Sequence, residues 1–208
     1  MCAIGAATAT AAQAEDTKPL FTYSGNGTFT ISGGTFQLEI QSGPLYICTG
    51  SNGTGRMGHS PANTAELTMT ISGCEAPGFK CTTTGLARGH VQTTKLTATF
   101  GKLGSGKVGI LLKPKVGSAF IEPTICDTES PMAWSGSLMG TLTPVETQTH
   151  SLTMGFKQSH STQEHTKFEG TEENDHLTLE GTGEFIEGLG IETEQTLTLK
   201  EGSGQLIA

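Results

Sequence analysis

The sequence predicts an all-β protein, an antiparallel β-sandwich or β-barrel built from about sixteen short strands. The first observation is a recurring Leu-Thr pattern of alternating apolar and polar residues, as in Leu67–Ile71, Leu96–Phe100 and Leu152–Phe156. Such alternation places apolar side chains on one face of a strand and polar side chains on the other. The second is that turn residues separate these segments roughly every 8–12 residues, which is typical of sandwiches and barrels. The third is that no amphipathic helix longer than about two turns is evident.

Two turn signals, Asn26-Gly27 and Ser32-Gly33-Gly34, separate the first strands. Asn-Gly is a strong signal for a two-residue hairpin turn, because both residues tolerate a positive φ. A second Asn-Gly at Asn52-Gly53 predicts another such turn. The strands expected in this part of the chain are Leu20–Tyr23, Gly27–Ile31, Thr35–Ile40 and Leu45–Cys48.

The same alternation predicts the strands in the rest of the chain. Residues 157–175 are the least regular region, because polar and charged side chains dominate there, and we expect a long hairpin or an exposed loop. The remaining expected strands are Arg56–Gly58, Glu66–Ser72, Leu86–Val91, Lys95–Phe100, Val108–Leu112, Ser118–Glu122, Ala133–Leu142, His150–Phe156, Thr166–Glu169, His176–Glu180, Glu184–Ile186 and Thr193–Leu199.

Length and charge limit the class of protein. The 208 residues are enough for one large β domain, which we place at residues 15–208, with a possible boundary between two lobes near residues 127–131. The net charge of −8 comes from residues 150–208, which hold eleven acidic residues and three lysines. Nucleic-acid binding needs a basic surface, so this distribution disfavours a nucleic-acid partner. A solvated acidic face is the simplest explanation of the charge.

Residues 1–14 look like the end of a secretory signal peptide. They are rich in alanine, carry no charge, and end in Ala12-Gln13-Ala14, which fits the small-residue rule for cleavage. They depart from the full pattern, because no Lys or Arg precedes the apolar part. No other stretch approaches the roughly 20 apolar residues of a transmembrane helix. We therefore expect a protein that is secreted or lies at the cell surface.

Four cysteines remain after such a cleavage: Cys48, Cys74, Cys81 and Cys126. An even number in an exported chain favours two disulfides. The spacing contains no C-x₂-C pair, which disfavours a zinc site. Three pairings are possible, and we favour Cys74–Cys81, across a turn that contains Pro77-Gly78, together with Cys48–Cys126.

Three segments carry a resemblance to a group of proteins: Leu67–Cys74, Lys95–Leu103 and Lys167–Gly170. They resemble uncharacterised exported all-β proteins of soil actinobacteria, which share a Leu-Thr-rich strand ending in Gly-Cys and a Lys-Phe-Glu-Gly segment near the end. The resemblance covers most of the mature chain. It implies secretion and an all-β fold, and it implies no activity.

No motif in the sequence identifies a catalysed reaction. Gly101–Lys107 is rich in glycine and follows an expected strand, as a phosphate-binding loop would. However, Val108 stands where such a loop carries Ser or Thr, and the residues that follow predict a strand and no helix. A glycine-rich turn is the better interpretation. The G-x-S-x-G sequence of serine hydrolases is also absent.

His160, His165 and Glu164 are the weak candidates for a metal site. The two histidines are five residues apart, which would place them on opposite faces of a strand and far apart around a helix. A loop could still gather them, although solvated loop histidines are the simpler interpretation. We therefore predict no cofactor.

Three functions stay open at this point. We favour a non-catalytic extracellular or cell-surface β-domain, a structural or binding module whose partner the sequence does not identify. The first alternative is a β-barrel carrier of a small apolar ligand, and the second is a secreted hydrolase with a site near the C-terminal histidines. The carrier would need an internal cavity, and the side chains expected to line it are Phe29, Met69, Phe100, Trp134 and Phe156.

Paired threonines recur along the chain in Thr-x-Thr segments. Aligned threonines on a flat sheet can order water, but the unequal intervals between the pairs predict no regular register. Carbohydrate binding commonly uses exposed aromatic rings, and the chain has only one Trp and two Tyr, so the sequence does not favour this function either. The segments are Thr28/Thr30, Thr68/Thr70, Thr97/Thr99, Thr141/Thr143 and Thr196/Thr198.

Overall fold

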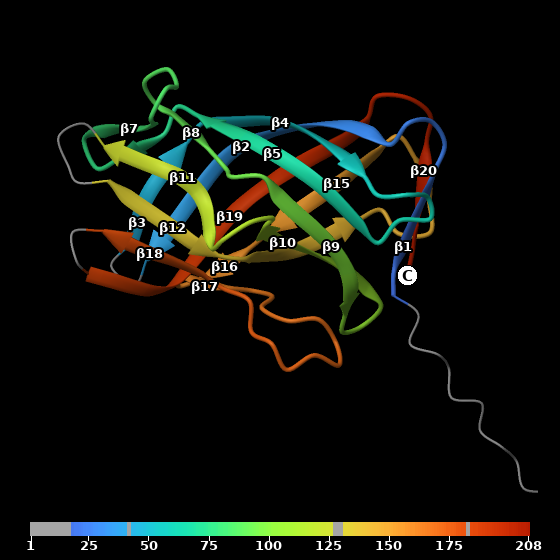
Figure 1. Ribbon diagram of the computed structural model, residues 1–208. Coiled ribbons are helices and arrows are strands. Elements are labelled where there is room, and N and C mark those ends of the chain that lie inside the picture. Colours follow the sequence, from blue (N-terminus) through green and yellow to red (C-terminus); the bar gives the residue numbers. More distant parts are fainter. Residues whose placement is uncertain (1–17, 41–42, 127–130, 182–183) are drawn as a thin grey trace, which may run out of the picture.

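The computed structural model describes residues 18–40, 43–126, 131–181 and 184–208 (Figure 1). In these ranges the chain forms twenty strands and no helix, which confirms the antiparallel all-β prediction. Two strands are much longer than the rest, β2 (Thr28–Ile40) and β19 (Glu184–Leu199), and they pair with each other. The predicted signal-peptide remnant, residues 1–14, lies outside the described residues.

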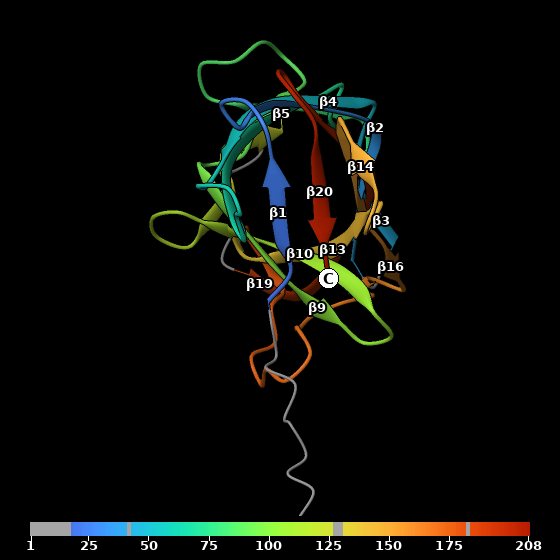
Figure 2. The ribbon, with the colours of Figure 1, turned by 90° about the vertical axis from the view of Figure 1, so that its right-hand side faces the viewer.

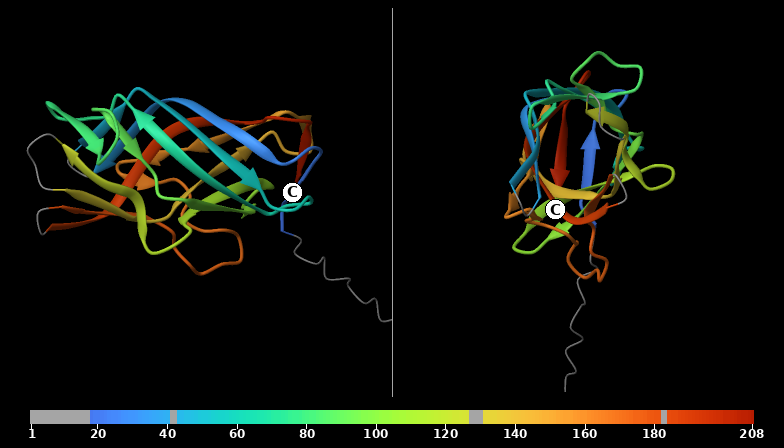
Figure 3. Two further views of the ribbon diagram at one scale, coloured as in Figure 1. Left: turned by 45° about the horizontal axis from the view of Figure 1, so that its top comes forward. Right: turned by 90° about the vertical axis from the view of Figure 1, so that its left-hand side faces the viewer.

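Eight strands close into a first ring through consecutive antiparallel pairs. The order around this ring is β2, β4, β5, β9, β10, β13, β15 and β19, and the β2–β19 pair completes it. Figure 2 and the right-hand view of Figure 3, which look along the ring from its two ends, show the strands arranged in a closed outline. Beyond β2 and β19, the strands of the ring are β4 (Gly50–Met57), β5 (Thr64–Ser72), β9 (Leu96–Leu103), β10 (Lys107–Pro114), β13 (Leu138–Thr143) and β15 (Ser151–Phe156).

The C-terminal half of β2 and the N-terminal half of β19 belong to a second ring. Its order is β2, β3, β6, β7, β11, β12, β18 and β19, so both rings share the two long strands. The fold is therefore barrel-like, with one sheet closed twice. The additional strands are β3 (Gly43–Cys48), β6 (Glu75–Ala76), β7 (Phe79–Thr83), β11 (Ala119–Cys126), β12 (Met132–Gly136) and β18 (Leu177–Gly181).

A small separate sheet covers one end of the first ring. Its order is β1, β20, β14, and Figure 2 shows β1 and β20 lying across the opening. Phe21 and Leu206 come from this sheet and are buried, so the open end is closed by apolar side chains. The remaining short strands lie beside the rings. The bounds are β1 (Leu20–Tyr23), β20 (Gly204–Ile207), β14 (Gln148–Thr149), β8 (His90–Gln92), β16 (Gln158–Ser159) and β17 (Thr162–Gln163).

The predicted turn at Ser32-Gly33-Gly34 is wrong, because β2 runs through it without a break. The pairing of β2 with β19 shifts its register here, between Thr193 and Gln195. A Cβ on Gly33 would lie only 2.3 Å from the Gln195 amide, so the missing side chain makes room for a buried neighbour. The expected strands Glu184–Ile186 and Thr193–Leu199 also form one strand, β19, which continues through the bulge.

The second Asn-Gly turn is also wrong, because Asn52-Gly53 lies inside β4. A Cβ on Gly53 would lie 2.5 Å from the carbonyl oxygen of Thr68, so the glycine permits close strand approach. The hairpin turn predicted at the first Asn-Gly is also wrong, because β1 and β2 do not pair with each other. Asn26-Gly27 instead lies in a bend that leads from β1 into β2, and Gly27 has a φ of 71°.

A single hydrophobic cluster fills the interior of both rings. It includes all five side chains that a carrier cavity would need, and each is buried. Phe29 packs over Gly55, where a Cβ would lie 2.2 Å from its ring, and Phe156 packs over Gly140 in the same way. The cluster continues from Phe120 to Trp134, on both sides of the suggested lobe boundary, most of which lies outside the described residues.

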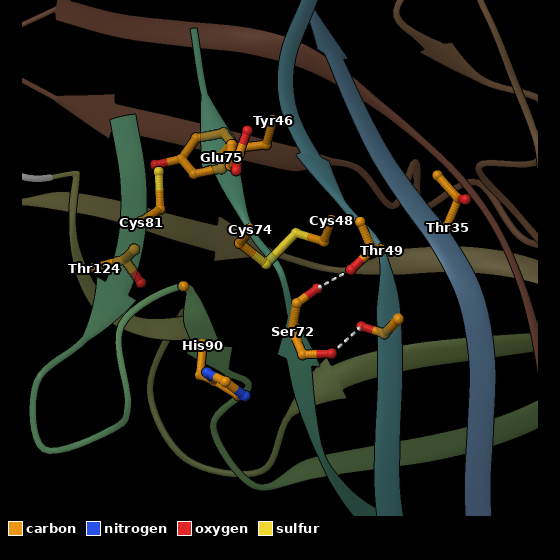
Figure 4. Close-up of a disulfide and its surroundings, with 12 residues drawn as sticks. Thr35, Tyr46, Cys48, Thr49, Ser72, Cys74, Glu75, Cys81, His90 and Thr124 are labelled. Atoms are coloured by element: carbon orange, nitrogen blue, oxygen red, sulfur yellow. Dashed lines mark hydrogen bonds between the residues drawn. A yellow bond between two sulfur atoms is a disulfide. The ribbon is translucent and has the colours of Figure 1, made fainter. Parts of the chain in front are cut away.

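The disulfides are Cys48–Cys74 and Cys81–Cys126, so the predicted pairing is wrong. Cys74 and Cys81 do lie beside each other, and the N–H of Cys81 donates to the carbonyl of Cys74. Each sulfur nevertheless reaches the strand on its other side, where the Cα atoms are 4.0 Å apart in both bridges. Figure 4 shows the Cys48–Cys74 bond with Tyr46 and Cys81 nearby. All four cysteines are buried in the second ring.

Non-reducing peptide mapping should recover Cys48 joined to Cys74 and Cys81 joined to Cys126. Trypsin cleaves after Lys80 and thereby separates Cys74 from Cys81, so the two pairings give different linked peptides. Recovery of a Cys48–Cys126 peptide would contradict the structure. The bridges close loops of 26 and 45 residues, for which chain entropy predicts similar stabilisation of roughly 3.5 and 4 kcal/mol. Double serine variants of either bridge should therefore lower the melting temperature by similar amounts.

Candidate functional site

The most regular surface feature is a pair of rows of hydroxyl groups on the outer face of the first ring. In both rows, each residue is the direct register partner of the next one, across neighbouring strands. Only Asn52 lacks a hydroxyl. The first row is Thr68, Thr54, Thr30, Thr198 and Ser151; the second row is Thr70, Asn52, Ser32, Thr196, Thr153 and Thr143.

These side chains point outward, because the residues between them in each strand are the buried core residues. In β5, for example, Leu67, Met69 and Ile71 are buried while the threonines between them are partly exposed. Neighbouring strands are about 4.8 Å apart, so the first row extends over about 19 Å. The two rows are separated by two residues along each strand, or about 6.7 Å.

Most hydroxyls in the rows are available to a ligand. Among the described residues, the side chains of Thr30, Thr54, Thr68, Thr70 and Thr196 hydrogen-bond to no protein group. The exception lies at the end of the first row, where Ser151 and Thr198 hydroxyls are 3.1 Å apart. A hydroxyl can donate one hydrogen bond and accept two, so the rows offer both kinds of group.

The rows correct an expectation from the sequence. The unequal intervals between the Thr-x-Thr segments predicted no register, yet Thr68, Thr30 and Thr198 lie in the first row, and Thr70 and Thr196 lie in the second. The intervals are unequal because strands that are neighbours in the ring are distant in the chain. Thr97 and Thr99 lie on β9, outside the rows, so their substitution is a matched control for substitutions in the rows.

A groove of about 720 Å³ adjoins the second row. Ser32 and Thr196 from that row line it, together with Glu192, Glu194 and Lys157. The groove exists because glycines line it: a Cβ on Gly34 would have no atom within 4 Å, and a Cβ on Gly155 would meet only the Thr141 hydroxyl. A larger side chain at Gly34 would therefore occupy the groove without disturbing the core.

Residues 157–176, here called the strap, cross the outside of the ring below β9 and β10 (Figure 1). Phe168 packs against a small apolar cluster that faces outward, formed by Leu103, Leu111 and Met139. It also lies over Gly101, where a Cβ would be 2.4 Å from its ring. The strap is a short hairpin and an attached loop, as expected for this region, but the strand predicted at Thr166–Glu169 is absent from it.

Polar contacts fix both ends of the strap. The side chain of Gln163 accepts a hydrogen bond from the N–H of Ile191 (2.9 Å) and donates one to its carbonyl (3.2 Å). It thereby satisfies β19 backbone groups between the parts that pair with β18 and with β15. At the other end, buried Asp175 accepts from Ser137 (2.8 Å) and pairs with Lys113 (2.8 Å). The hydrogen bond to Asp175 raises the pKa of the Lys113 ammonium.

The structure brings together two of the three metal-site candidates. Glu164 and His165 lie 3.6 Å apart between Oε1 and Nε2, and both line a cavity of about 290 Å³. His160 lies in the turn between β16 and β17, with its Nδ1 3.1 Å from the Ser159 hydroxyl. Within the described ranges, no group of three or more His, Cys, Asp or Glu side chains could hold a metal ion.

The glycine-rich segment at Gly101–Lys107 is a hairpin turn, as predicted. Gly104, Ser105 and Gly106 connect β9 to β10, and Ser105 and Gly106 have positive φ values of 68° and 73°. A strand follows the turn, so no helix N-terminus is present here to bind a phosphate. The turn instead places Lys107 at the rim of the cavity that contains His165.

The comparisons with known proteins give no further assignment. No family model, no curated protein and no solved structure matches this chain. None of the described segments is a helix long and apolar enough to cross a membrane.

Replacing Phe168 with Ala should loosen the strap. Because this half-buried ring packs on one side only, we expect the free energy of unfolding to fall by about 1–3 kcal/mol, less than for a fully buried Phe. Hydrogen exchange should become faster at residues 164–171 and stay slow in β9 and β10. The control is Lys167→Ala, an exposed neighbour, and equal effects of the two substitutions would show that the ring does not anchor the strap.

The charges beside the first row give a pH-dependent prediction. Hydrogen bonds from Lys115 and then Lys95 lower the pKa of Glu66 from 4.5 to about 2. Because the folded-state pKa is lowered, these contacts stabilise the fold above pH 4.5, and the contribution is lost as the pH falls to about 2. The group is exposed, so the effect should be small.

Urea unfolding of the wild type and Glu66→Gln should differ slightly above pH 4.5, and the difference should vanish near pH 2. Carbon NMR of the Glu66 carboxyl should give a titration midpoint near the lower value. A midpoint near 4.5 would show that the lysines do not hold the carboxylate in solution.

Proposed function

We propose that the protein is a non-catalytic extracellular or cell-surface β-domain that binds a neutral polysaccharide on its outer face. The observation that carries the proposal is the pair of hydroxyl rows in register across five neighbouring strands. They form a polar and nearly uncharged strip that continues into the adjoining groove. A polysaccharide presents repeated hydroxyls that donate and accept hydrogen bonds, as the strip does.

Such binding would be weak for each sugar unit. Aromatic platforms are missing from the strip, and Trp134 and Tyr46 are buried in the core. Each exchange of water for a ligand hydroxyl yields a small net gain, because water also hydrogen-bonds to the hydroxyls. Affinity would therefore depend on many contacts along a polymer, which fits a strip about 19 Å long better than a closed pocket.

Ordered water is the competing explanation of a regular threonine array. A β-sheet twists by about 20–25° from one strand to the next, so five strands accumulate a rotation of about 80–100°. A flat crystal surface could match only two or three neighbouring strands of such an array. A flexible polymer can follow the twist, which favours the polysaccharide.

The two alternative functions have less support. A carrier of apolar ligands would use the interior, where Phe29, Met69, Phe100, Trp134 and Phe156 pack together in one cluster. A hydrolase near the C-terminal histidines would need them to converge with acids. His150 instead contacts the Gly202 carbonyl and His176 the Asn174 carbonyl, and both are exposed.

The two disulfides support an extracellular location, because such bonds persist in oxidising compartments. The Ala12-Gln13-Ala14 sequence supports export by a cleaved signal, which would leave a mature chain that begins near Glu15.

Retention on insoluble cellulose, chitin and bacterial cell wall tests the function. We expect the wild type to be retained on at least one polymer, and Thr30→Val/Thr54→Val to reduce retention about ten-fold by removing two central hydroxyls of nearly the same shape. Gly34→Phe should have a similar effect by filling the groove. The control Thr97→Val/Thr99→Val changes two threonines outside the rows. No retention on any polymer, or equal loss in the control, would contradict the proposal.

A further inference from the structure

A second cavity lies on the other side of Gly155 and Lys157 from the groove, and both residues line both spaces. Its volume of about 290 Å³ is close to the lower end of the range for ligand pockets, roughly 300–1,000 Å³. It is enclosed by the β9–β10 turn, the end of β13 and the strap. It shares no residue of the hydroxyl rows except Thr143.

The cavity has an apolar part and a cationic rim. Val145 is half-buried and is the apolar side chain of the wall that a ligand can reach, because the neighbouring Val108 and Leu142 are buried in the ring interior. Lys107 and Lys157 stand at the rim, and in the described part of the chain neither ammonium belongs to an ion pair. An apolar wall beside unpaired cations is suited to an anion that carries an apolar body.

The strap supplies the remaining polar groups. The N–H of Glu164 donates to the carbonyl of Lys157 (2.9 Å), which closes the hairpin of the strap next to the end of β15. His165 Nε2 is buried and has no hydrogen-bond partner, since Glu164 Oε1 at 3.6 Å is too distant. Because this nitrogen has almost no accessible surface, it does not face the cavity, and His165 forms part of the wall through its other atoms.

We propose that this cavity binds a small carboxylate with an apolar body, such as a short aliphatic or aromatic acid. The carboxylate lies between Lys107 and Lys157 at the rim, and the apolar body lies against Val145. Apart from the imidazole of His165, the two lysines and Glu164 leave one net positive charge in the lining. Phe168 and Gln163 hold the strap in place before the ligand arrives, which lowers the entropic cost of binding.

This inference is independent of the polysaccharide proposal, because it rests on a different cavity, which shares only Gly155 and Lys157 with the groove and Thr143 with the second row. Lys107 lines the second cavity and lies outside the groove. Lys107→Gln should therefore weaken carboxylate binding and leave retention on polysaccharide unchanged. Thr30→Val/Thr54→Val should have the opposite pattern, so failure of one proposal is distinguishable from failure of the other.

Titration of the ¹⁵N-labelled full chain with benzoate tests the proposal, with benzyl alcohol as an uncharged control of similar shape. We expect saturable shifts at the amides of Val108, Leu142 and His165 with benzoate, and about ten-fold weaker binding of benzyl alcohol. Hexanoate replaces benzoate in a second arm, which distinguishes an aromatic from an aliphatic preference.

Three variants make the assignment specific. Lys107→Gln should weaken benzoate binding about ten-fold, and Glu164→Gln should strengthen it by removing the acid in the lining. Lys167→Gln removes an exposed lysine of the strap that does not line the cavity, and it should change nothing. Equal binding of benzoate and benzyl alcohol, shifts confined to other residues, unchanged binding in Lys107→Gln, or no saturation at about 20 mM benzoate would overturn the proposal.

Discussion

The antiparallel contact between β2 and β19 holds the two rings together, because each ring uses one half of both strands. The two halves of each strand pair with different neighbours, and the register between β2 and β19 changes where the rings meet. It does so at the bulge between Thr193 and Gln195. Three polar side chains lie in the interior at this bulge and hydrogen-bond to one another: Ser51 donates to Gln195, which in turn donates to Thr193 (2.7 Å).

The same bulge explains where the surface features lie. Gly33 and Gly34 have no side chains, and the groove lies over this segment of β2 beside the bulge. At the other edge of β19, Gln163 from the strap hydrogen-bonds to Ile191, which lies between the parts of β19 that pair with β18 and with β15. The strap is thereby brought against β15, where it forms one wall of the smaller cavity. Groove and cavity are both consequences of joining two rings on one pair of strands.

Local sequence patterns were sufficient for the fold class and insufficient for the topology. Alternation identifies a strand from its own residues, and this succeeded throughout β5, β9 and β15. Glycine was ambiguous, since Gly33 and Gly53 permit close approach of neighbouring chains inside strands where a turn was expected. The cysteine pairing failed for a related reason: Cys74 and Cys81 are neighbours, yet their sulfurs bond to strands distant in sequence.

The candidate site was predictable only in part. The Thr-x-Thr segments and the pair Glu164 and His165 were visible as residues, but their neighbours depend on which strands adjoin in the ring. No local signal reports that Thr30 lies between Thr54 and Thr198. Lys107 was noticed only as part of a glycine-rich turn, and its role at the rim of the cavity follows from the strap that crosses nearby.

Closure of the sheet also bears on how such a chain stays dispersed at high concentration. A protein made almost wholly of strands would expose unpaired backbone along every sheet edge, and such edges recruit other chains into aggregates. Here the main sheet, in its described part, ends only at β8, which has three residues, and the small sheet ends at β1 and β14, with four and two. Phe21 of β1 further bonds to Ala62. With so little open edge in its described part, the chain can reach a high local concentration without pairing edge to edge with its own copies.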